Sequence, residues 1–274
     1  MPTLSLTSFT RFKATDLISR VSTGPRNAQG VELEGNDISI GGDISPDGRF
    51  AVFATQASNL GSDPWVQNHV ILHKDLQTGA VRQVAVHGSN PIFSPDGRWV
   101  LFLGDGGRLP GGSSGVTDLF LRDLQTGTLR RVSAEARDAQ GNEAGGNQNS
   151  AEGSFSADGR YVVFSSYASN LAGPDSLGSD VFRKDLQTGA ILRVSLTSGG
   201  QAPNGESSQP IVSADGRYVV FTSTADNLVA GDTNGEPDVF RKDLQTGPSS
   251  GSRPPPRTHK DGRPKRTTGL PAHR

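Results

Sequence analysis

The chain has no cysteine, a single methionine and two tryptophans among its 274 residues. Disulfides, thiolate metal sites and cysteine nucleophiles are therefore excluded. No apolar run approaches the roughly 20 residues of a membrane-spanning helix. The first 20 residues contain no apolar segment of the kind that opens a secretory signal, so no signal peptide is predicted and the sequence by itself assigns no compartment.

Glycine and proline are plentiful instead, at 35 and 17 residues, whereas apolar residues reach only 32% and aromatic residues 6%. This composition favours many short strands joined by tight turns over long helices. The net charge of −1 is divided unevenly. Residues 248–274 carry a charge of +6, so residues 1–247 carry −7. An acidic body argues against nucleic-acid binding by the folded part.

Two short motifs recur four times each in register. Ser-x-Asp-Gly-Arg begins at Ser45, Ser94, Ser156 and Ser213, and Asp-Leu-Gln-Thr-Gly begins at Asp75, Asp123, Asp185 and Asp243. Within a repeat the two motifs lie 29 or 30 residues apart, whereas successive repeats are 49, 62 and 57 residues apart. The interior of the unit is thus fixed in length and the connection between units varies. A period of this size, with several strands in each period, is typical of a propeller blade.

Each repeat reads as four strands. The first ends at the Ser-x-Asp-Gly turn, where Asp and Gly favour a tight hairpin. The second strand is apolar on both faces, so both faces must be covered, as they are when blades stack face to face. The predicted second strands are Arg49–Ala54, Arg98–Leu103, Arg160–Ser165 and Arg217–Thr222. The predicted third strands are Val70–Lys74, Asp118–Arg122, Asp180–Lys184 and Asp238–Lys242. The predicted fourth strands are Ala80–Val86, Thr128–Ser133 and Ala190–Ser195.

The predicted organisation is an all-β propeller of about four four-stranded antiparallel blades. Residues 1–17 are irregular, residues 18–22 form a lone outer strand, and residues 248–274 form a disordered, basic, proline-rich tail. Blades are expected at about 38–86, 90–133, 151–195 and 209–247. The fourth repeat lacks its last strand. Two arrangements follow: an open array, or a ring that Leu17–Ser22 closes by supplying that strand.

These motifs resemble the WD40-like repeats of TolB-type bacterial β-propeller proteins. The resemblance rests on S-x-D-G-R-[YFW]-V-x-F, D-V-F-x-[KR]-D-L-x-T-G and R-V-S, and on the linker Asn227–Phe240, across residues 18–247. It implies a propeller that serves as a protein-interaction platform in the periplasm, at the cell surface or outside the cell, and it brings no catalytic residues. Six or more blades are usual in that family. The four repeats and the unrelated tail therefore favour a truncated or frame-shifted reading of a longer protein.

One loop has the composition of a metal site. Asp232, Asn234 and Asp238 place three side-chain oxygens around a glycine before a predicted strand. Calcium binds six to eight such oxygens in flexible loops, so Ca²⁺ is the one cofactor that the sequence suggests. The alternative is that Asp and Asn shape an Asx turn that leads into the strand.

Other polar residues read as structural. An acid that recurs in every repeat is expected to maintain the first turn, and the arginine that follows it is expected to pair or pack locally. The acids are Asp47, Asp96, Asp158 and Asp215, and the arginines are Arg49, Arg98, Arg160 and Arg217. His69 and His73 share one strand face, but no third metal ligand accompanies them. No Ser/His/Asp set is recognised, and no catalytic residue is assigned.

The sequence therefore predicts a non-enzymatic scaffold that binds a protein or a glycan, without a membrane span. The long polar loops 23–42, 134–153 and 196–208 are its expected contact surface. Two alternatives stay open. One is a calcium-stiffened structural part of a larger exported protein, and the other is a propeller hydrolase with a site in its central channel.

Overall fold

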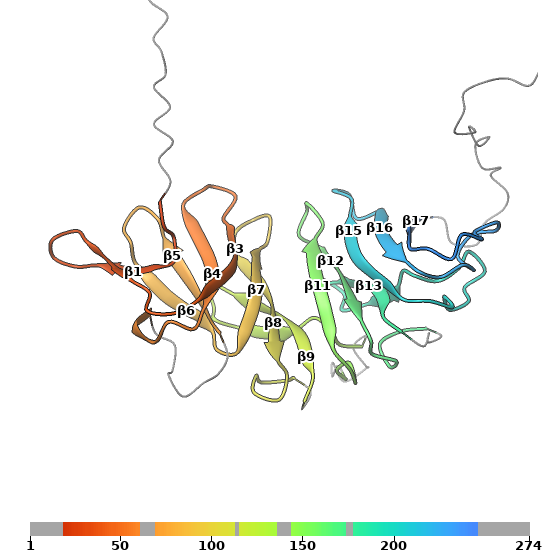
Figure 1. Cartoon of the computed structure of the whole chain (residues 1–274), viewed down its shortest axis with the longest axis horizontal. Helices are drawn as coiled ribbons and strands as arrows, with labels where there is room; N and C mark the ends of the chain where they lie inside the picture. The colour runs from red at the N-terminus through yellow and green to blue at the C-terminus, as the bar shows by residue number, and fades with distance from the viewer. Residues whose placement is uncertain (1–18, 61–68, 113–114, 136–143, 174–177, 246–274) are drawn as a thin grey trace, which may run out of the picture.

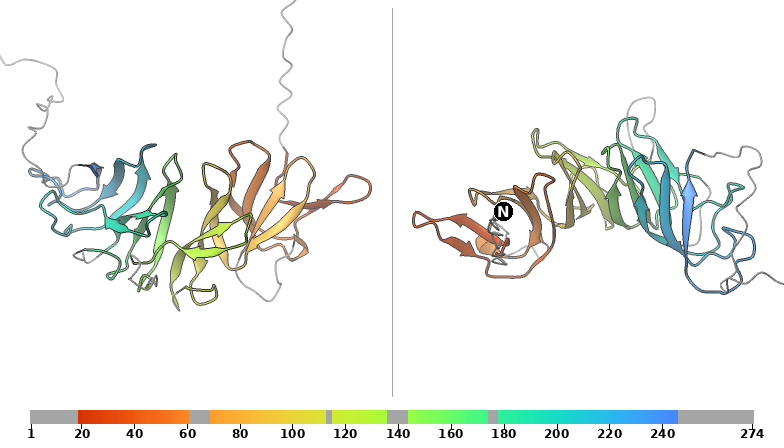
Figure 2. Two further views of the ribbon diagram at one scale, coloured as in Figure 1. Left: turned by 180° about the vertical axis from the view of Figure 1, so that it is seen from behind. Right: turned by 90° about the horizontal axis from the view of Figure 1, so that it is seen from above.

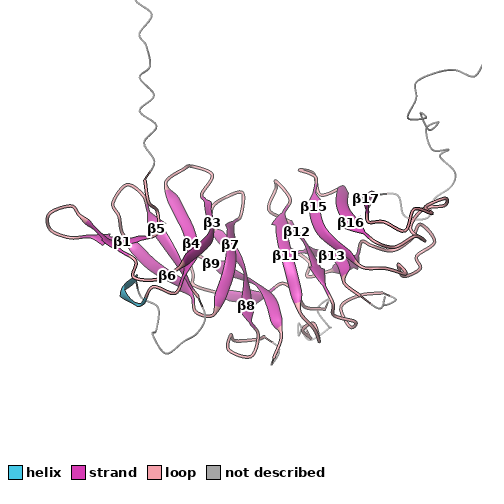
Figure 3. Cartoon of the chain, viewed as in Figure 1, coloured by secondary structure: helices cyan, strands magenta, loops and turns pink. Residues whose placement is uncertain are grey.

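A computed structural model describes residues 19–60, 69–112, 115–135, 144–173 and 178–245. These residues form consecutive antiparallel sheets (Figure 1), and their helical content is the single 3-10 turn η1 (Ser58–Leu60), drawn in cyan in Figure 3. No helix in this described part is long and apolar enough to cross a membrane. The fold is a β-propeller array, as the repeat predicts.

Each sheet is a meander whose neighbouring strands are also neighbours in the chain, and we call the sheets blades 1 to 4. Blade 1 contains β3 (Ser39–Ile44), β4 (Phe50–Thr55), β5 (Val70–Asp75) and β6 (Val81–Ala85). Blade 2 contains β7 (Gly88–Phe93), β8 (Trp99–Asp105), β9 (Thr117–Asp123) and β10 (Leu129–Arg131). Blade 3 contains β11 (Ser150–Phe155), β12 (Tyr161–Ser166), β13 (Asp180–Asp185) and β14 (Ile191–Arg193). Blade 4 contains β15 (Ser207–Val212), β16 (Tyr218–Ser223) and β17 (Asp238–Asp243), and the hairpin β1 (Thr23–Arg26) and β2 (Glu32–Glu34) precedes blade 1.

The first turn of each blade is built as the sequence predicts. In blade 3, Ser156 Oγ donates to Asp158 at 2.5 Å, and the same carboxylate accepts the backbone N–H of Arg160 at 3.0 Å. Gly159 takes the positive φ of 69° that the turn requires. The other three blades repeat these two bonds through Asp47, Asp96 and Asp215. The structural interpretation of these four acids is confirmed.

The arginine after each turn connects the two sequence motifs. Arg160 pairs with Asp185, the first residue of Asp-Leu-Gln-Thr-Gly, at 2.7 Å, and its guanidinium lies 4.9 Å from the centre of the Tyr161 ring. The equivalent pairs are Arg49–Asp75, Arg98–Asp123 and Arg217–Asp243. The constant spacing of the motifs follows, because the pair spans one strand hairpin of fixed length.

Blades pack face to face. Each blade has a forward face toward the next blade and a backward face toward the previous one. Leu101 and Leu119, on the forward face of blade 2, pack against Val162, Phe164 and Phe182 on the backward face of blade 3, and all five are at most 1% exposed. The stacked rings of Phe164 and Phe182 lie 5.6 Å apart. Apolar residues on both faces of the inner strands are therefore buried, which explains their unbroken hydrophobic runs.

The array is open. Blade 1 and blade 4 lie at opposite ends of the molecule in all views (Figures 1 and 2). Residues 19–22 form no strand but lead into β1, and Val21 packs against the buried cluster of Phe53, Ala57, Leu60, Val70 and Leu72. Closure of blade 4 by Leu17–Ser22 is thus not the arrangement found here. Residues 1–18 and 246–274, which include the expected irregular start and basic tail, lie outside the described residues.

Candidate functional site

The two edges of the array differ in character. One edge, which we call the turn face, carries the short Ser-x-Asp-Gly and Asp-Leu-Gln-Thr-Gly turns that every blade repeats. The opposite edge, the loop face, carries the connections from the second to the third strand, which differ in composition, and those from one blade to the next, which differ in both length and composition. Groups that differ between blades are the ones available for a specific task, so the search for a site begins at the loop face.

Asparagines tie the loop face together in three of the blades, within the described residues. In blade 3, the Asn147 amide donates to Ser169 Oγ at 2.8 Å, and its backbone N–H donates to Asn170 Oδ1 at 2.9 Å. The Asn170 amide then donates to the Gly145 carbonyl at 2.8 Å. We call this arrangement the asparagine clasp. Blades 1 and 4 repeat it with Asn36, Ser58 and Asn59 and with Asn204, Asp226 and Asn227.

Blade 2 departs from this pattern. Its first strand follows blade 1 after a connection of very few residues, so no asparagine lies before β7 to form a clasp. Elsewhere a hydroxyl pair joins the first two strands, as Ser150 and Ser166 do at 3.0 Å in blade 3. In blade 2 the paired positions are Gly88 and Gly104. A Cβ on Gly104 would lie 2.4 Å from a methyl group of Leu109, so the glycine makes room for this leucine below the loop face.

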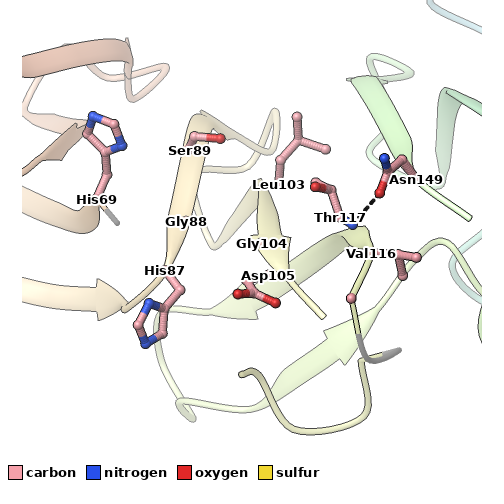
Figure 4. Close-up of a pocket in the computed structure, with 11 residues that line it drawn as sticks. His69, His87, Gly88, Ser89, Leu103, Gly104, Asp105, Val116, Thr117 and Asn149 are labelled. Carbon is pink, nitrogen blue, oxygen red and sulfur yellow. Dashed lines mark hydrogen bonds between the residues drawn. The ribbon is translucent and has the colours of Figure 1, made fainter. Parts of the chain in front are cut away.

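A cleft of about 440 Å³ opens at this break in the repeat. Figure 4 shows the side chains that surround it, which come from blades 1, 2 and 3. Its walls include His69, His87, Ser89, Asp105, Thr117 and Asn149. Protein pockets for small ligands span about 300–1,000 Å³, so the cleft can accept a few side chains or a comparable small group.

Hydrogen bonds hold the walls of the cleft in place. Asn149 Oδ1 accepts the backbone N–H of Thr117 at 2.8 Å, which ties the entrance of blade 3 to blade 2. The Asp105 backbone N–H donates to the His87 carbonyl at 3.1 Å, and Asp105 Oδ1 accepts the N–H of Gly107 at 3.0 Å. His87 has a positive φ of 55°, which is uncommon for a residue with a side chain. The strained backbone is typical of a functional position.

The chemistry of the walls suits recognition of a polar ligand. Imidazole, hydroxyl, carboxylate and amide groups offer both donors and acceptors, and apolar contact comes from Leu103 and Val116. Among the described residues no group of three or more His, Cys, Asp or Glu side chains is placed to hold a metal ion. The arrangement therefore favours hydrogen bonding to peptide or side-chain groups.

A second hollow, of about 480 Å³, lies on the turn face between blades 1 and 2. Its walls include Asp75 and Arg98, which belong to the repeated framework. His73, at its base, stacks on Phe50 at 4.7 Å and is 6% exposed. Burial, and then the nearby Arg82 charge, lower the pKa of His73 to about 4, so the ring is neutral at pH 7. The structural interpretation of His73 holds, whereas His69 lies at the loop-face cleft.

The predicted metal loop folds as a turn in this structure. Asn234 Oδ1 accepts the N–H of Glu236 at 3.0 Å, which is an Asx turn, and the Asn234 amide donates to Asp238 at 3.0 Å. The structure therefore brings Asn234 and Asp238 together. Asp232 lies on the same exposed loop at the start of the turn. Calcium binding by these three residues stays a prediction.

A bulge recurs in the first strand of all four blades. The pairing register shifts there, and the bulged residue has a φ between 50° and 53°. The four residues are Gly41, Asn90, Glu152 and Gln209. The Glu152 carboxylate accepts the N–H of Gln209 at 2.6 Å, which links the bulges of blades 3 and 4. The bulge bends the first strand and fixes its register.

The long loops were the expected contact surface, but the cleft lies where the connection between blades is shortest. The signal was present in the sequence as the one place where His-Gly-Ser replaces a long polar loop. Periodicity marked this as an exception without showing that it opens a cleft, because the clasps that close the other blades are visible only in three dimensions.

No protein-family model matches the chain, and no curated protein matches it. Solved structures of similar arrangement include TolB from Acinetobacter baumannii, at 18% identity and a TM-score of 0.47 over 81% of this chain and 46% of that one. The β-propeller domain of the Trilobed protease from Pyrococcus furiosus has 12% identity and a TM-score of 0.47 over 76% and 58% of the two chains. Oligogalacturonate lyase from Vibrio parahaemolyticus has 13% identity and a TM-score of 0.44 over 80% and 57%. The chain thus spans about half the length of these proteins, and at such values the likeness concerns the fold alone.

Proposed function

We propose that this chain is a binding module that holds a polar segment of a protein partner in the loop-face cleft of blade 2. The partner is expected to lie along the loop face, with one or a few polar side chains in the cleft. The fold supports an interaction role, because rigid stacked blades present loops at a fixed spacing. We also propose that this role is carried out in the periplasm or outside the cell, a location that the resemblance of the repeats supports.

One observation carries the proposal: the cleft opens at the one described blade that lacks both the asparagine clasp and the hydroxyl pair. In blades 1, 3 and 4 the hydrogen bonds of the asparagine clasp satisfy polar groups of the loop face within the chain. In blade 2, the hydroxyl groups of Ser89 and Thr117 lie at an open surface instead. A polar group that has no fixed internal partner gains most from a ligand that supplies one.

The cleft also matches the interior of a typical interface. Polar groups that surround a small apolar contact give orientation and specificity, and a few well-placed residues supply most of the binding free energy. Leu103 and Val116 provide the apolar contact, and the His69 imidazole and the Thr117 hydroxyl offer polar groups beside it. A short extended peptide with polar side chains fits this pattern better than an apolar ligand does.

The test uses peptides selected from a random library on the immobilised full chain. Each selected peptide is then titrated against the wild type, against Ser89→Trp, which fills the cleft, and against Thr126→Trp, an exposed change on the turn face of the same blade. We expect Ser89→Trp to weaken binding by about tenfold or more, and Thr126→Trp to leave it unchanged. Thermal melts check that both variants fold. Equal binding by both variants, or selection of no peptide, contradicts the proposal.

A further inference from the structure

A buried polar network joins the third and fourth strands of blades 2 and 3. In blade 3, Asp180 pairs with Arg193, and Ser195 Oγ donates to Asp180 at 2.6 Å. The same hydroxyl accepts the backbone N–H of Val181 at 3.2 Å. Blade 2 repeats the network with Asp118, Arg131 and Ser133. All the carboxylates of the network are at most 1% exposed.

The three residues of this network occur as a set. In blade 1 the aspartate position is Val70, and the positions of the arginine and the serine are Gln83 and Ala85. This is expected on physical grounds, because a buried carboxylate without its arginine, or the reverse, leaves an uncompensated charge. An aspartate at this position of a blade therefore calls for an Arg-Val-Ser segment beside it.

Blade 4 has the aspartate without the segment. Asp238 begins β17, and within the described residues β17 has no neighbour on its outer side. No Arg-Val-Ser follows it anywhere in the sequence. The one such segment that has no aspartate of its own is Arg20-Val21-Ser22, at the other end of the described chain. There Arg20 pairs with Glu34 on the surface, with 57% of its side chain exposed.

The two end faces of the array are also more open than the internal faces. On the forward face of blade 4, Val239 is 71% and Val220 is 37% exposed, whereas the equivalent Val181 and Val163 of blade 3 are fully buried. On the backward face of blade 1 the opening is confined to the part around Ile44, which is 55% exposed, whereas its equivalent in blade 4, Val212, is 8% exposed. Phe53 and Leu72, at the centre of that face, are at most 5% exposed. A hollow of about 490 Å³ lies beside Ile44, lined also by Val21, Ile40 and Phe53.

The N-terminal segment already sits on blade 1 as the end of a preceding blade would. Lys74 of blade 1 donates to Thr23, just after Arg20-Val21-Ser22. In the same way Lys184 of blade 3 donates to the carbonyl of Ala134, which follows the Arg-Val-Ser of blade 2, at 3.0 Å. The segment therefore lies where the fourth strand of a preceding blade would lie, and its Arg-Val-Ser sequence fits a blade whose third strand carries an aspartate.

We infer that the chain associates head to tail with a second copy of itself, in which Arg20 and Ser22 of one copy complete the buried network around Asp238 of the other. The forward face of blade 4 then covers the backward face of blade 1 of the second copy, as each forward face covers the next blade within the chain. The two ends of one described array lie far apart, so Arg20 and Asp238 of the same copy do not meet (Figures 1 and 2). A contact of this kind closes into a ring or continues as a line of copies.

Sedimentation velocity of the full chain across a wide concentration range tests the contact. We expect the wild type to associate as its concentration rises. Val239→Lys places a charge on the exposed forward face without disturbing the interior, and it should weaken association by about tenfold or more. Val229→Lys, on an exposed loop of the same blade, is the control and should leave association unchanged.

An exchange of charges between Arg20 and Asp238 shows whether a second copy covers the forward face of blade 4. Asp238→Arg and Arg20→Asp should each remain monomeric, and an equimolar mixture of the two variants should associate as the wild type does, because each junction then joins opposite charges. Closure within one chain, or cover of blade 4 by its own residues 246–274, gives no rescue on mixing. A wild type that stays monomeric at all concentrations, or variants that associate unmixed, overturns the inference.

Discussion

Asp180 and Arg193 form an ion pair that is closed off from solvent between the third and fourth strands of blade 3, with 1% and 0% of the two side chains exposed. The arginine also donates to the carbonyl of Ala172 at 2.8 Å, and its guanidinium lies 5.1 Å from the centre of the Phe182 ring. One side chain therefore ties the outer strand, the loop face and the blade interior together.

Removal of one partner should be costly. Asp180→Ala leaves the arginine charged and buried, and we expect a loss of about 3–5 kcal/mol in the free energy of unfolding, measured by urea denaturation. Blade 1, which has Val70, Gln83 and Ala85 at these three positions, offers the residues for a matched control. The triple change Asp180→Val, Arg193→Gln and Ser195→Ala removes the charges together, and should recover most of the loss. Equal losses for the single and the triple variant would show that the pair has no special role.

His73 should make stability depend on pH between about 4 and 6.5. Burial lowers its pKa to about 4 in the folded chain, whereas the unfolded chain binds the proton near the ordinary value of 6.5. The unfolded state therefore binds more protons in this window, and stability falls as the pH falls. We expect the loss between pH 7 and pH 4 to shrink by about 2–3 kcal/mol in His73→Leu. The check is a set of urea curves across this range, and parallel profiles for both proteins would contradict the assignment.

The framework carboxylates should govern stability at lower pH. The hydrogen bonds from Arg49 and from the turn amides lower the pKa of Asp75 to about 2. A depressed carboxylate stabilises the fold above its ordinary pKa, and that stability is lost as the pH falls from about 4 toward 2. Asp75→Asn should therefore be less stable than the wild type at pH 7 and show a shallower acid transition by circular dichroism. An unchanged acid profile would remove Asp75 from this role.

The bulge at Gln209 should tolerate glycine but not valine. Its φ is 53°, and blade 1 has Gly41 at the same place. Gln209→Gly relieves the strain but loosens the unfolded chain, so we expect a change of less than about 1 kcal/mol. Gln209→Val should cost about 2 kcal/mol, because β-branched residues disfavour positive φ. Similar stabilities for the two variants in urea denaturation would show that the bulge relaxes in solution.

Calcium binding by the loop of Asp232, Asn234 and Asp238 is tested by thermal melts. A site of millimolar affinity at about 10 mM Ca²⁺ adds about 1.4 kcal/mol, or a shift of about 3–5 °C in Tm. We expect this shift in calcium relative to chelator, and expect Asp232→Asn to reduce it. Superimposable melting curves of the wild type in calcium and in chelator would contradict calcium binding by this loop.

The turns and strands of the blade framework could be predicted from the sequence because they repeat. Ser156, Asp158 and Arg160 recur with their partners in every unit, and one interpretation had to fit four environments. The second strands are bounded by their motifs, and the observed ends, such as Tyr161–Ser166, differ from the expected ones by one or two residues. The loop-face cleft could not be predicted in this way. It depends on Asn147 and Asn170 meeting across two loops elsewhere, and on Gly88 facing Gly104, and such pairings across the sheet have no signature along the chain.

The end faces show the same limit. The missing last strand of blade 4 could be read from the sequence, and so could a strand-like segment at Leu17–Ser22. That its described part, residues 19–22, lies on blade 1 and far from blade 4 follows from Val21, which packs against the buried cluster around Phe53. The segment that we propose as the partner of Asp238 is therefore that of a second copy, and not that of the same chain.

The most direct test of the binding site is hydrogen–deuterium exchange of the full chain with and without a peptide selected on it. The account predicts slower exchange at the amides of Gly88–Ser89, Leu103–Asp105 and Gly115–Thr117, with the turn face of blade 2 unchanged. Protection confined to the turn face, or to the long loops of blades 3 and 4, would contradict it.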